Sequence, residues 1–330
     1  MNQLRTYRAV IIGAGIISSS HLKTMANHSR TELAAIADIS LEKAQAAADA
    51  YGIKAYTDYK EMILEEKPDI AVITLPHFLH REASLFCAEH GCHVLLEKPM
   101  ALNARECAEI IEAAKRAGIV LGVGHIQHFL AENIKAKQIV ESGQLGKLVA
   151  VNDRRYAFYF DEKRPAWFLD KALSGGGIVI NLGSHSIDRI QWITGEPIAK
   201  VKASLTFYGD RGNVEGSANL LMQTQQGTAV TVNLYGYRGA PANETEYLFT
   251  GGSLKVAARK GIWISGPKGY EPLETESFPD AFTAQWDELL AAVERGERMS
   301  ISGEYARTVS AVIDAVYRSH DTGTEQEVEL

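Results

Sequence analysis

A lysine and a histidine stand out in this chain of 330 residues as side chains that could handle the proton of an alcohol. Lys98 lies in the tripeptide Glu97-Lys98-Pro99, directly after the continuously apolar run His93–Leu96. Such a run predicts a buried strand of a parallel sheet, and ligands bind at the carboxyl ends of these strands. A lysine held there by a proline-stiffened turn is therefore a candidate catalytic group.

His185 follows a run of glycines at 175–177, in a segment that also contains Asn181 and Asp188. If a helix begins near Val179, these polar side chains fall at i, i+4 and i+7 on one face. A polar stripe with a histidine behind a glycine run favours a functional site. The alternative is that Asn181 and His185 only satisfy buried backbone groups.

Lys98 and His185 together suit the oxidation of an alcohol. A neutral imidazole can accept the hydroxyl proton because its pKa lies close to the working pH. An ammonium near the same oxygen can stabilise developing alkoxide charge and lower the pKa of the imidazole. We therefore predict Lys98, His185 and Asn181 as the catalytic residues, with Asn181 as the positioning group.

A dinucleotide site is predicted near the start of the chain. Gly13 and Gly15 follow the apolar run Ala9–Ile12 as the first two glycines of GxGxxG, with Ser18 in the third position. Asp38 lies about 20 residues further on, where a carboxylate can bind the ribose hydroxyls and repel a 2′-phosphate. The expected cofactor is NAD, and NADP is less favoured. The alternatives are a plain tight turn and an Asp38 that only caps a helix.

The other candidates lie at predicted strand ends or before the glycine run. The cofactor-binding candidates are Gly13, Gly15, Ile16, Ile17, Asp38, Thr74, Pro76, His80, Glu97 and Lys98. The substrate-binding candidates are Lys98, His125, Gln127, Tyr156, Trp167, Asn181 and His185. His77 and His80 have HxxH spacing, which we interpret as a polar rim and helix start, and no metal site is predicted.

Two domains are expected from the pattern of apolar residues. Short apolar runs alternate with helical stretches in residues 1–125, which predicts an α/β Rossmann domain with a parallel, doubly wound sheet. Runs of alternating polarity in residues 126–330 predict an α+β domain with a large, open, mainly antiparallel sheet. The alternative is that the last helices, Phe282–Arg295 and Gly303–Ser319, pack on the first domain.

Composition limits the partners and the compartment. The net charge of −7, with no basic run, argues against nucleic-acid binding. No segment is long and apolar enough to cross a bilayer and no signal peptide is recognised, so we expect no membrane contact and a cytoplasmic location. The cysteines Cys87, Cys92 and Cys107 form no CxxC pair and are expected to be buried free thiols.

These motifs together resemble the Gfo/Idh/MocA family, which includes glucose–fructose oxidoreductase and inositol dehydrogenase. The resemblance covers nearly the whole chain and rests on the glycine loop, residues 67–76, Glu97-Lys98-Pro99 and residues 175–188. It implies a Rossmann domain joined to an α+β domain, whose open sheet forms the interface of a homo-oligomer, a dimer or tetramer. It also implies catalytic roles for Lys98 and His185. Inositol dehydrogenase-like members carry Asp where this chain has Asn181, which casts doubt on inositol itself as the substrate.

The predicted function is NAD-dependent oxidation, by hydride transfer, of a secondary hydroxyl of a sugar, a sugar derivative or a cyclic polyol. Two alternatives remain open. One is an NAD-dependent glycoside hydrolase or lyase that uses transient oxidation, which net NADH formation would separate from the leading prediction. The other is a dinucleotide-binding regulator without catalysis.

Overall fold

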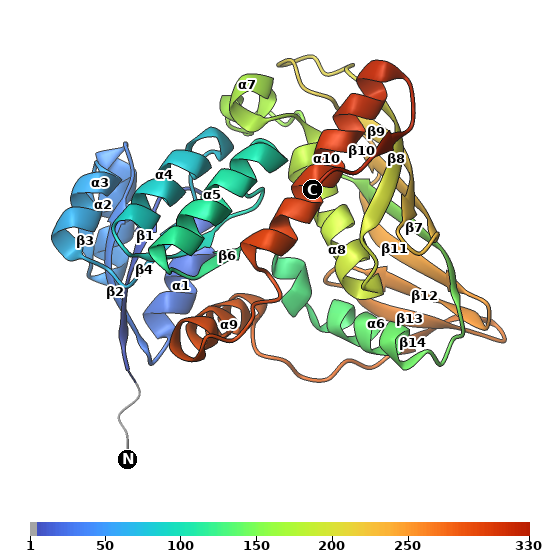
Figure 1. Cartoon of the computed structure of the whole chain (residues 1–330), viewed down its shortest axis with the longest axis horizontal. Coiled ribbons are helices and arrows are strands. Elements are labelled where there is room, and N and C mark those ends of the chain that lie inside the picture. Colours follow the sequence, from blue (N-terminus) through green and yellow to red (C-terminus); the bar gives the residue numbers. More distant parts are fainter. Residues whose placement is uncertain (1–4) are drawn as a thin grey trace. The chain divides into compact units, whose positions relative to one another are not determined.

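The computed structural model describes residues 5–330, and its contacts divide the chain into two compact units. Unit 1 contains the described residues up to Ala101, together with Arg105–Gly124 and Pro279–Ala306. Unit 2 contains Leu102–Ala104, His125–Phe278 and Arg307–Leu330. The colours of Figure 1 show how far apart in sequence the segments of one unit are.

Unit 1 is built on a parallel sheet of six described strands in the order β3-β2-β1-β4-β5-β6. The strands are β1 (Tyr7–Ile12), β2 (Thr31–Ala37), β3 (Lys54–Tyr56), β4 (Ile70–Ile73), β5 (His93–Leu96) and β6 (Leu121–Val123). The strand order reverses beside β1, which is where doubly wound folds bind their ligands. The predicted Rossmann class is therefore confirmed.

Helices connect these strands and cover them (Figure 1). They are α1 (Ser18–Asn27), α2 (Leu41–Tyr51), α3 (Tyr59–Glu66), α4 (His77–Glu89), α5 (Ala104–Ala117) and α9 (Ala281–Arg295). Local chemistry explains their ends: Ser40 caps the start of α2 by accepting from the Lys43 amide, and Gly52 ends it in the left-handed conformation. All residues of β4 are buried, which is why its sequence is continuously apolar.

The segment Pro279–Ala306 completes the core of unit 1. Trp286 on α9 is 1% exposed and donates its indole N–H to the Thr31 hydroxyl at 2.9 Å. The Met299 side chain fills the space beside Gly122, where a Cβ would lie 2.8 Å from it. Buried contacts of this kind bind the segment to the Rossmann strands.

The predicted bounds of the second domain, residues 126–330, differ from the residues that make up unit 2. Pro279–Ala306 belong to unit 1, which was the alternative for the helix at Phe282–Arg295. The physical reason is the burial of Trp286 and Met299, which depends on partners that lie far away in the sequence.

Unit 2 is built on a sheet of nine described strands in the order β14-β13-β12-β11-β7-β10-β9-β8-β15. The strands are β7 (Leu148–Tyr156), β8 (Ile198–Thr206), β9 (Ser217–Thr224), β10 (Ala229–Tyr235), β11 (Ala242–Phe249), β12 (Gly252–Ala257), β13 (Gly261–Gly266), β14 (Gly269–Leu273) and β15 (Gln326–Glu327). The pairs are antiparallel except for β7 with β10. The predicted mainly antiparallel sheet is thus confirmed.

One face of this sheet is covered by helices. Figure 1 shows α6 (Ala131–Ser142), α8 (Ser184–Thr194) and α10 (Gly303–Thr322) on the same side of it. Shorter helical turns are η1 (Ile126–Phe129), η2 (Ala166–Leu169), α7 (Lys171–Ser174) and the π-helix η3 (Val179–Gly183). Burial alternates along β9, and Leu221 on its outer face is 57% exposed. The predicted open face therefore exists within unit 2.

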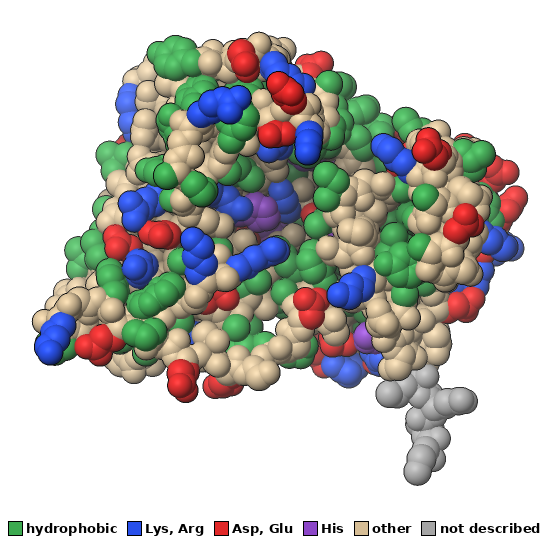
Figure 2. All heavy atoms as spheres, turned by 180° about the vertical axis from the view of Figure 1, so that it is seen from behind, with side chains coloured by type: hydrophobic (Ala, Val, Ile, Leu, Met, Phe, Trp, Pro, Cys, Tyr) green, Lys and Arg blue, Asp and Glu red, His purple; other side chains and the backbone are tan. Residues whose placement is uncertain are grey.

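The described surface carries charges of both signs. On the face seen in Figure 2, basic and acidic side chains are interspersed. Among residues 5–330 no helix combines the length and the apolar character that crossing a bilayer requires. The expectation of buried free thiols is confirmed, because Cys87, Cys92 and Cys107 are all buried and unpaired by disulfides.

Candidate functional site

The glycine loop after β1 approaches the end of β4 very closely. Gly13 has a φ of +104°, and a Cβ there would lie 2.8 Å from the Thr74 carbonyl oxygen. The Thr74 hydroxyl donates to the Gly13 carbonyl at 2.8 Å. A Cβ at Gly15 would make only ordinary contact, at 3.8 Å from the same Thr74 oxygen. The fold therefore requires a glycine at position 13. At Gly15 no protein atom covers the backbone closely, so a diphosphate could approach it.

The start of α1 fits an anion. Its N-cap residue Ile17 makes no side-chain cap, and the first turn contains no acidic residue. Amide groups at an uncapped helix start carry partial positive charge and bind phosphate groups. Ser18 fits the third glycine position because it is small and 3% exposed, and its hydroxyl donates to the Gly15 carbonyl at 2.6 Å. Ile16 is 89% exposed beside this loop. These residues fit the diphosphate of a dinucleotide.

Asp38 is fixed at the end of β2. Its carboxylate accepts from the Ala14 amide at 2.8 Å and from the Ser40 amide at 2.9 Å. The first contact joins Asp38 to the glycine loop, which is where a ribose would lie. The next residue, Ile39, is 95% exposed and supplies no positive charge for a 2′-phosphate. This arrangement fits NAD better than NADP.

Glu97 holds the backbone of Lys98 in place. Its Oε1 lies 2.9 Å from Nε2 of His21 on α1, and its Oε2 accepts from the Lys98 amide at 3.1 Å. Burial acts to raise the pKa of Glu97, but the contacts with His21 and Lys98 outweigh it and lower that pKa. The absence of a side chain at Gly124 makes room, because a Cβ there would lie 3.1 Å from the carboxylate. Glu97, predicted to bind cofactor, thus has a positioning role within unit 1.

His21 is a site residue that the sequence reasoning missed. It is 3% exposed, and Phe282 meets its ring edge-on at a centroid distance of 5.2 Å. Its place on the buried face of α1, one turn after Ser18, was the available signal. The partner Glu97 could not be recognised from spacing, because it lies far away in the sequence, directly after β5.

His80 supports the turn after β5 instead of facing a ligand. The ring is fully buried, with Nδ1 2.9 Å from the Pro99 carbonyl and Nε2 2.8 Å from the Leu75 carbonyl. A ring held on both sides has no nitrogen left for a cofactor, so this geometry does not fit the predicted direct contact. His80 instead joins the Lys98–Pro99 turn to the end of β4, just before Pro76 at the start of α4.

The glycine run in unit 2 lies against two other segments. A Cβ at Gly176 would lie 1.8 Å from the Tyr317 hydroxyl, and one at Gly177 would lie 2.2 Å from the Glu215 carbonyl oxygen. The Glu215 carboxylate accepts from the amides of Gly177 at 2.8 Å and Val179 at 3.0 Å. It also accepts from the Tyr317 hydroxyl at 3.0 Å. Glu215 thus fixes the start of η3, and neither it nor Tyr317 was predicted.

Asn181 and His185 follow on this fixed helix start. Asn181 is 7% exposed and donates through its carboxamide nitrogen to the Tyr159 hydroxyl at 3.4 Å. Burial raises the pKa of Tyr159 to about 12, so its phenol is protonated near neutral pH. His185 lies in the first turn of α8 and is half-buried. The arrangement gives one histidine with partial access and one amide held at a defined orientation.

Asp188, predicted on one polar face with Asn181, contacts two histidines at the start of unit 2. It is fully buried, 2.8 Å from Nε2 of His128 and 3.4 Å from Nδ1 of His125. Burial would raise the pKa of Asp188, but the two histidines hold it well below its usual range. Trp192 stacks on His128 at 4.5 Å. His125, a predicted substrate-binding residue, is 2% exposed, and the buried carboxylate of Asp188 orients its ring.

The other substrate candidates lie in unit 2 with partners of their own. Gln127 is buried, and its side-chain oxygen accepts from Asn133 at 3.2 Å, which indicates a structural role. Tyr156 meets the Tyr235 ring edge-on at 5.8 Å. Trp167 stacks on its neighbour Phe168.

Of the catalytic candidates, Lys98 belongs to unit 1, and Asn181 and His185 belong to unit 2. Residues 5–330 contain no group of three or more His, Cys, Asp or Glu side chains arranged to hold a metal.

The depressed pKa of Glu97 predicts how acid acts on unit 1. Because the folded-state pKa is lowered, ionised Glu97 stabilises the fold above its unfolded pKa, and this stabilisation is lost as pH falls through the folded value. We expect Glu97→Gln to lower the melting temperature at pH 7 and to reduce its further fall on acidification to pH 4. Calorimetry at a series of pH values measures both. A constant difference between wild type and variant over that range would contradict the expectation.

The chain was compared with known protein families. Residues 7–125 match the model of an oxidoreductase family with an NAD-binding Rossmann fold. Residues 133–255 match the model of the GFO/IDH/MocA C-terminal domain. The two matches fall in the parallel sheet and in the antiparallel sheet, respectively.

Individual proteins are similar over much or all of the chain. The D-glucoside 3-dehydrogenase of Escherichia coli K12 is 32% identical over 58% of this chain and 55% of its own. The inositol 2-dehydrogenase of Salmonella typhimurium LT2 is 26% identical over 98% of this chain and 97% of its own. The crystal structure of the aldose-aldose oxidoreductase of Caulobacter crescentus, complexed with glycerol, superimposes with a TM-score of 0.89 at 26% identity, over 98% of this chain and all of that one. The chain therefore belongs to the Gfo/Idh/MocA family of NAD-binding oxidoreductases.

Proposed function

We propose that this protein catalyses the NAD-dependent oxidation of a secondary hydroxyl of a sugar, a sugar derivative or a cyclic polyol. The observation that carries the proposal is the chemistry of Lys98 and His185 in a chain whose Rossmann unit fits NAD. Lys98 is fixed by Glu97, and His185 stays partly accessible on a rigid helix start. The names of the relatives, a glucoside dehydrogenase, an inositol dehydrogenase and an aldose oxidoreductase, support this substrate class.

His185 is the proton acceptor in the proposed reaction. It takes the hydroxyl proton while the hydrogen on the same carbon leaves as hydride, so that the C–OH group becomes a carbonyl. Lys98 places its ammonium at the same oxygen and stabilises the alkoxide charge that develops there. When bound, the nicotinamide of NAD supplies the hydride acceptor. In the reverse direction His185 returns the proton.

Asn181 orients the reacting groups. Its carboxamide is held by the phenol of Tyr159, which stays protonated at neutral pH. A neutral amide can hold a substrate hydroxyl or the imidazole, but it cannot stabilise an imidazolium as a carboxylate would.

We also propose a homo-oligomer, a dimer or tetramer, assembled through the open face of the sheet in unit 2, and a cytoplasmic location. The exposed Leu221 lies on this face, on strand β9, which is flanked by β10 and β8 in the sheet. The buried thiols are compatible with a reducing compartment.

Replacing Lys98 or His185 should remove turnover, and replacing His185 should leave cofactor binding in place. We expect Lys98→Ala and His185→Ala each to lower kcat by about 10²- to 10⁴-fold, because each loses one proton-handling or charge-stabilising group. The assay follows NADH absorbance with a panel of sugars, inositols and glycosides, and NADH titration checks binding. Lys23→Ala, at an exposed lysine on α1, is the control. Full activity in either variant would refute the assigned role, and glycoside cleavage without net NADH would select the transient-oxidation alternative.

The cofactor preference should depend on the Asp38 carboxylate. The Ala14 and Ser40 amides donate to different oxygens of Asp38, so Asp38→Asn keeps an acceptor for only one of them and also removes the negative charge. We expect weaker NADH binding by about tenfold and a smaller preference over NADPH, because the repulsion of a 2′-phosphate is lost. Fluorescence titration with both cofactors measures this. Equal NADH and NADPH affinities in the wild type would contradict the assignment.

The oligomer should depend on the outer face of β9. Leu221→Glu is expected to shift the protein toward monomers in sedimentation velocity, because it would bury a charge in the interface. Leu64→Glu is the matched control, since Leu64 is 53% exposed on α3 in unit 1. A monomeric wild type, or an unchanged oligomer in Leu221→Glu, would rule out this interface.

A further inference from the structure

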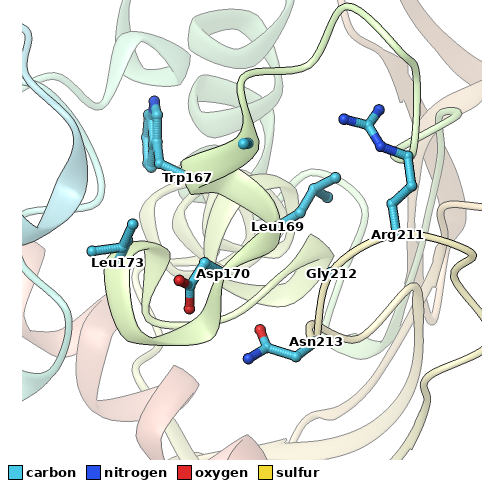
Figure 3. Close-up of a pocket in the computed structure, with 8 residues that line it drawn as sticks. Trp167, Leu169, Asp170, Leu173, Arg211, Gly212 and Asn213 are labelled. Carbon is cyan, nitrogen blue, oxygen red and sulfur yellow. The ribbon is translucent and has the colours of Figure 1, made fainter.

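Unit 2 contains a hollow of about 460 Å³ whose chemistry the proposed hydride transfer leaves unexplained. It lies between η2, α7 and residues 211–213 in the connection from β8 to β9 (Figure 3). Its volume falls in the range of about 300–1,000 Å³ that is typical of small-molecule sites. Trp167 is the one predicted substrate residue, within the described chain, that lines it.

The walls of the hollow are held together by backbone contacts. The Asn213 side-chain oxygen accepts from the Lys171 amide at 2.7 Å, and the Asn213 amide donates to the Leu169 carbonyl at 3.0 Å. Gly212, at a φ of +76°, lies so close that a Cβ would be 2.2 Å from the Leu169 carbonyl oxygen. The hollow is therefore a fixed feature of unit 2, formed where one loop is clamped on η2 and α7.

The polar groups in the hollow include both donors and acceptors. Asp170 uses Oδ1 to cap α7 at the Ala172 amide, and its Oδ2 makes no hydrogen bond within residues 5–330. Arg211 uses Nη1 on the Asp161 carbonyl at 2.9 Å and carries further N–H groups. The carboxamide nitrogen of Asn213 adds two donor hydrogens. One carboxylate and one guanidinium balance in charge, which favours a neutral ligand over a phosphate or a carboxylate.

Apolar surface lies beside these groups. Leu169 and Leu173 line the hollow together with the indole of Trp167, and Figure 3 shows Trp167 and Arg211 at opposite sides. An aromatic ring offers a surface to the C–H face of a sugar, while each sugar hydroxyl both donates and accepts. The lining therefore matches a polyhydroxylated ring.

The same chain segments hold the hollow and the proposed catalytic helix in place. Arg211 bonds the Asp161 carbonyl and Asn181 bonds the Tyr159 hydroxyl, so both are tied to one short segment. Glu215, two residues after Asn213, fixes the start of η3. We propose that the hollow is a subsite for a second sugar ring, so that the substrate is a disaccharide or another glycoside. This inference rests on the proposed function for the identity of the ring that is oxidised.

Kinetics on matched sugars test the subsite. Asn213→Asp keeps the oxygen that Lys171 requires but loses donor hydrogens, and Arg211→Gln loses the guanidinium. The probes are glucose and galactose against maltose, cellobiose, trehalose and lactose. We expect the ratio of kcat/KM for the best disaccharide to that for the best monosaccharide to fall about tenfold or more in each variant. Arg298→Gln, at an exposed arginine in unit 1, should leave the ratio unchanged.

Direct binding separates failure of the subsite from failure of the proposed function. Saturation-transfer NMR on the full chain detects each disaccharide without turnover, and melting temperatures confirm that the variants are folded. Binding that is lost in Asn213→Asp supports the subsite even if no sugar is oxidised. An unchanged kinetic ratio in both variants, or no disaccharide bound by the wild type, would overturn it.

Discussion

The carboxylate of Glu215 is the contact on which the proposed catalytic helix depends. It is 1% exposed and accepts from two amides at the start of η3 and from the hydroxyl of Tyr317 on α10. Burial raises the pKa of Glu215, so the three donors are what make an acidic group tolerable there. The segment can approach Glu215 and Tyr317 this closely only because Gly176 and Gly177 have no side chains. The positions of Asn181 and His185 follow from this anchor.

The same physical device recurs in unit 1. Asp38 is held by amides of the glycine loop and of the chain before α2, and Glu97 is held by His21 and the Lys98 amide. In each case an acidic side chain with restricted freedom fixes the backbone of the residue that faces the ligand. Because the partners are backbone groups or a buried ring, little entropy is left to lose when a ligand binds. The carboxylates of Asp38, Glu97 and Glu215 therefore organise the site without taking part in the proposed reaction.

Much of the fold could be predicted because it depends on local patterns. The strand at His93–Leu96 has the bounds that its apolar run predicted, and the helices predicted at Phe282–Arg295 and Gly303–Ser319 lie at Ala281–Arg295 and Gly303–Thr322. Residue types at strand ends indicated which residues could form the candidate site. They did not indicate which partners those residues contact. His80 and Gln127 have suitable chemistry, yet contacts with backbone or with Asn133 occupy them, and such contacts are set by tertiary packing.

The return of the chain to unit 1 has a consequence for biosynthesis. Ile301 accepts from the Val123 amide at 2.8 Å, and Ser302 bridges to Gly122, so the edge of β6 is completed by residues translated long after it. Unit 2 in turn needs β15, which pairs with β8. Since ribosomes add residues in order, the core of unit 1 is incomplete until Pro279–Ala306 have been synthesised, and the sheet of unit 2 is incomplete until β15 has been synthesised. Until then both halves expose apolar surface, and chaperone binding during translation would protect them from aggregation.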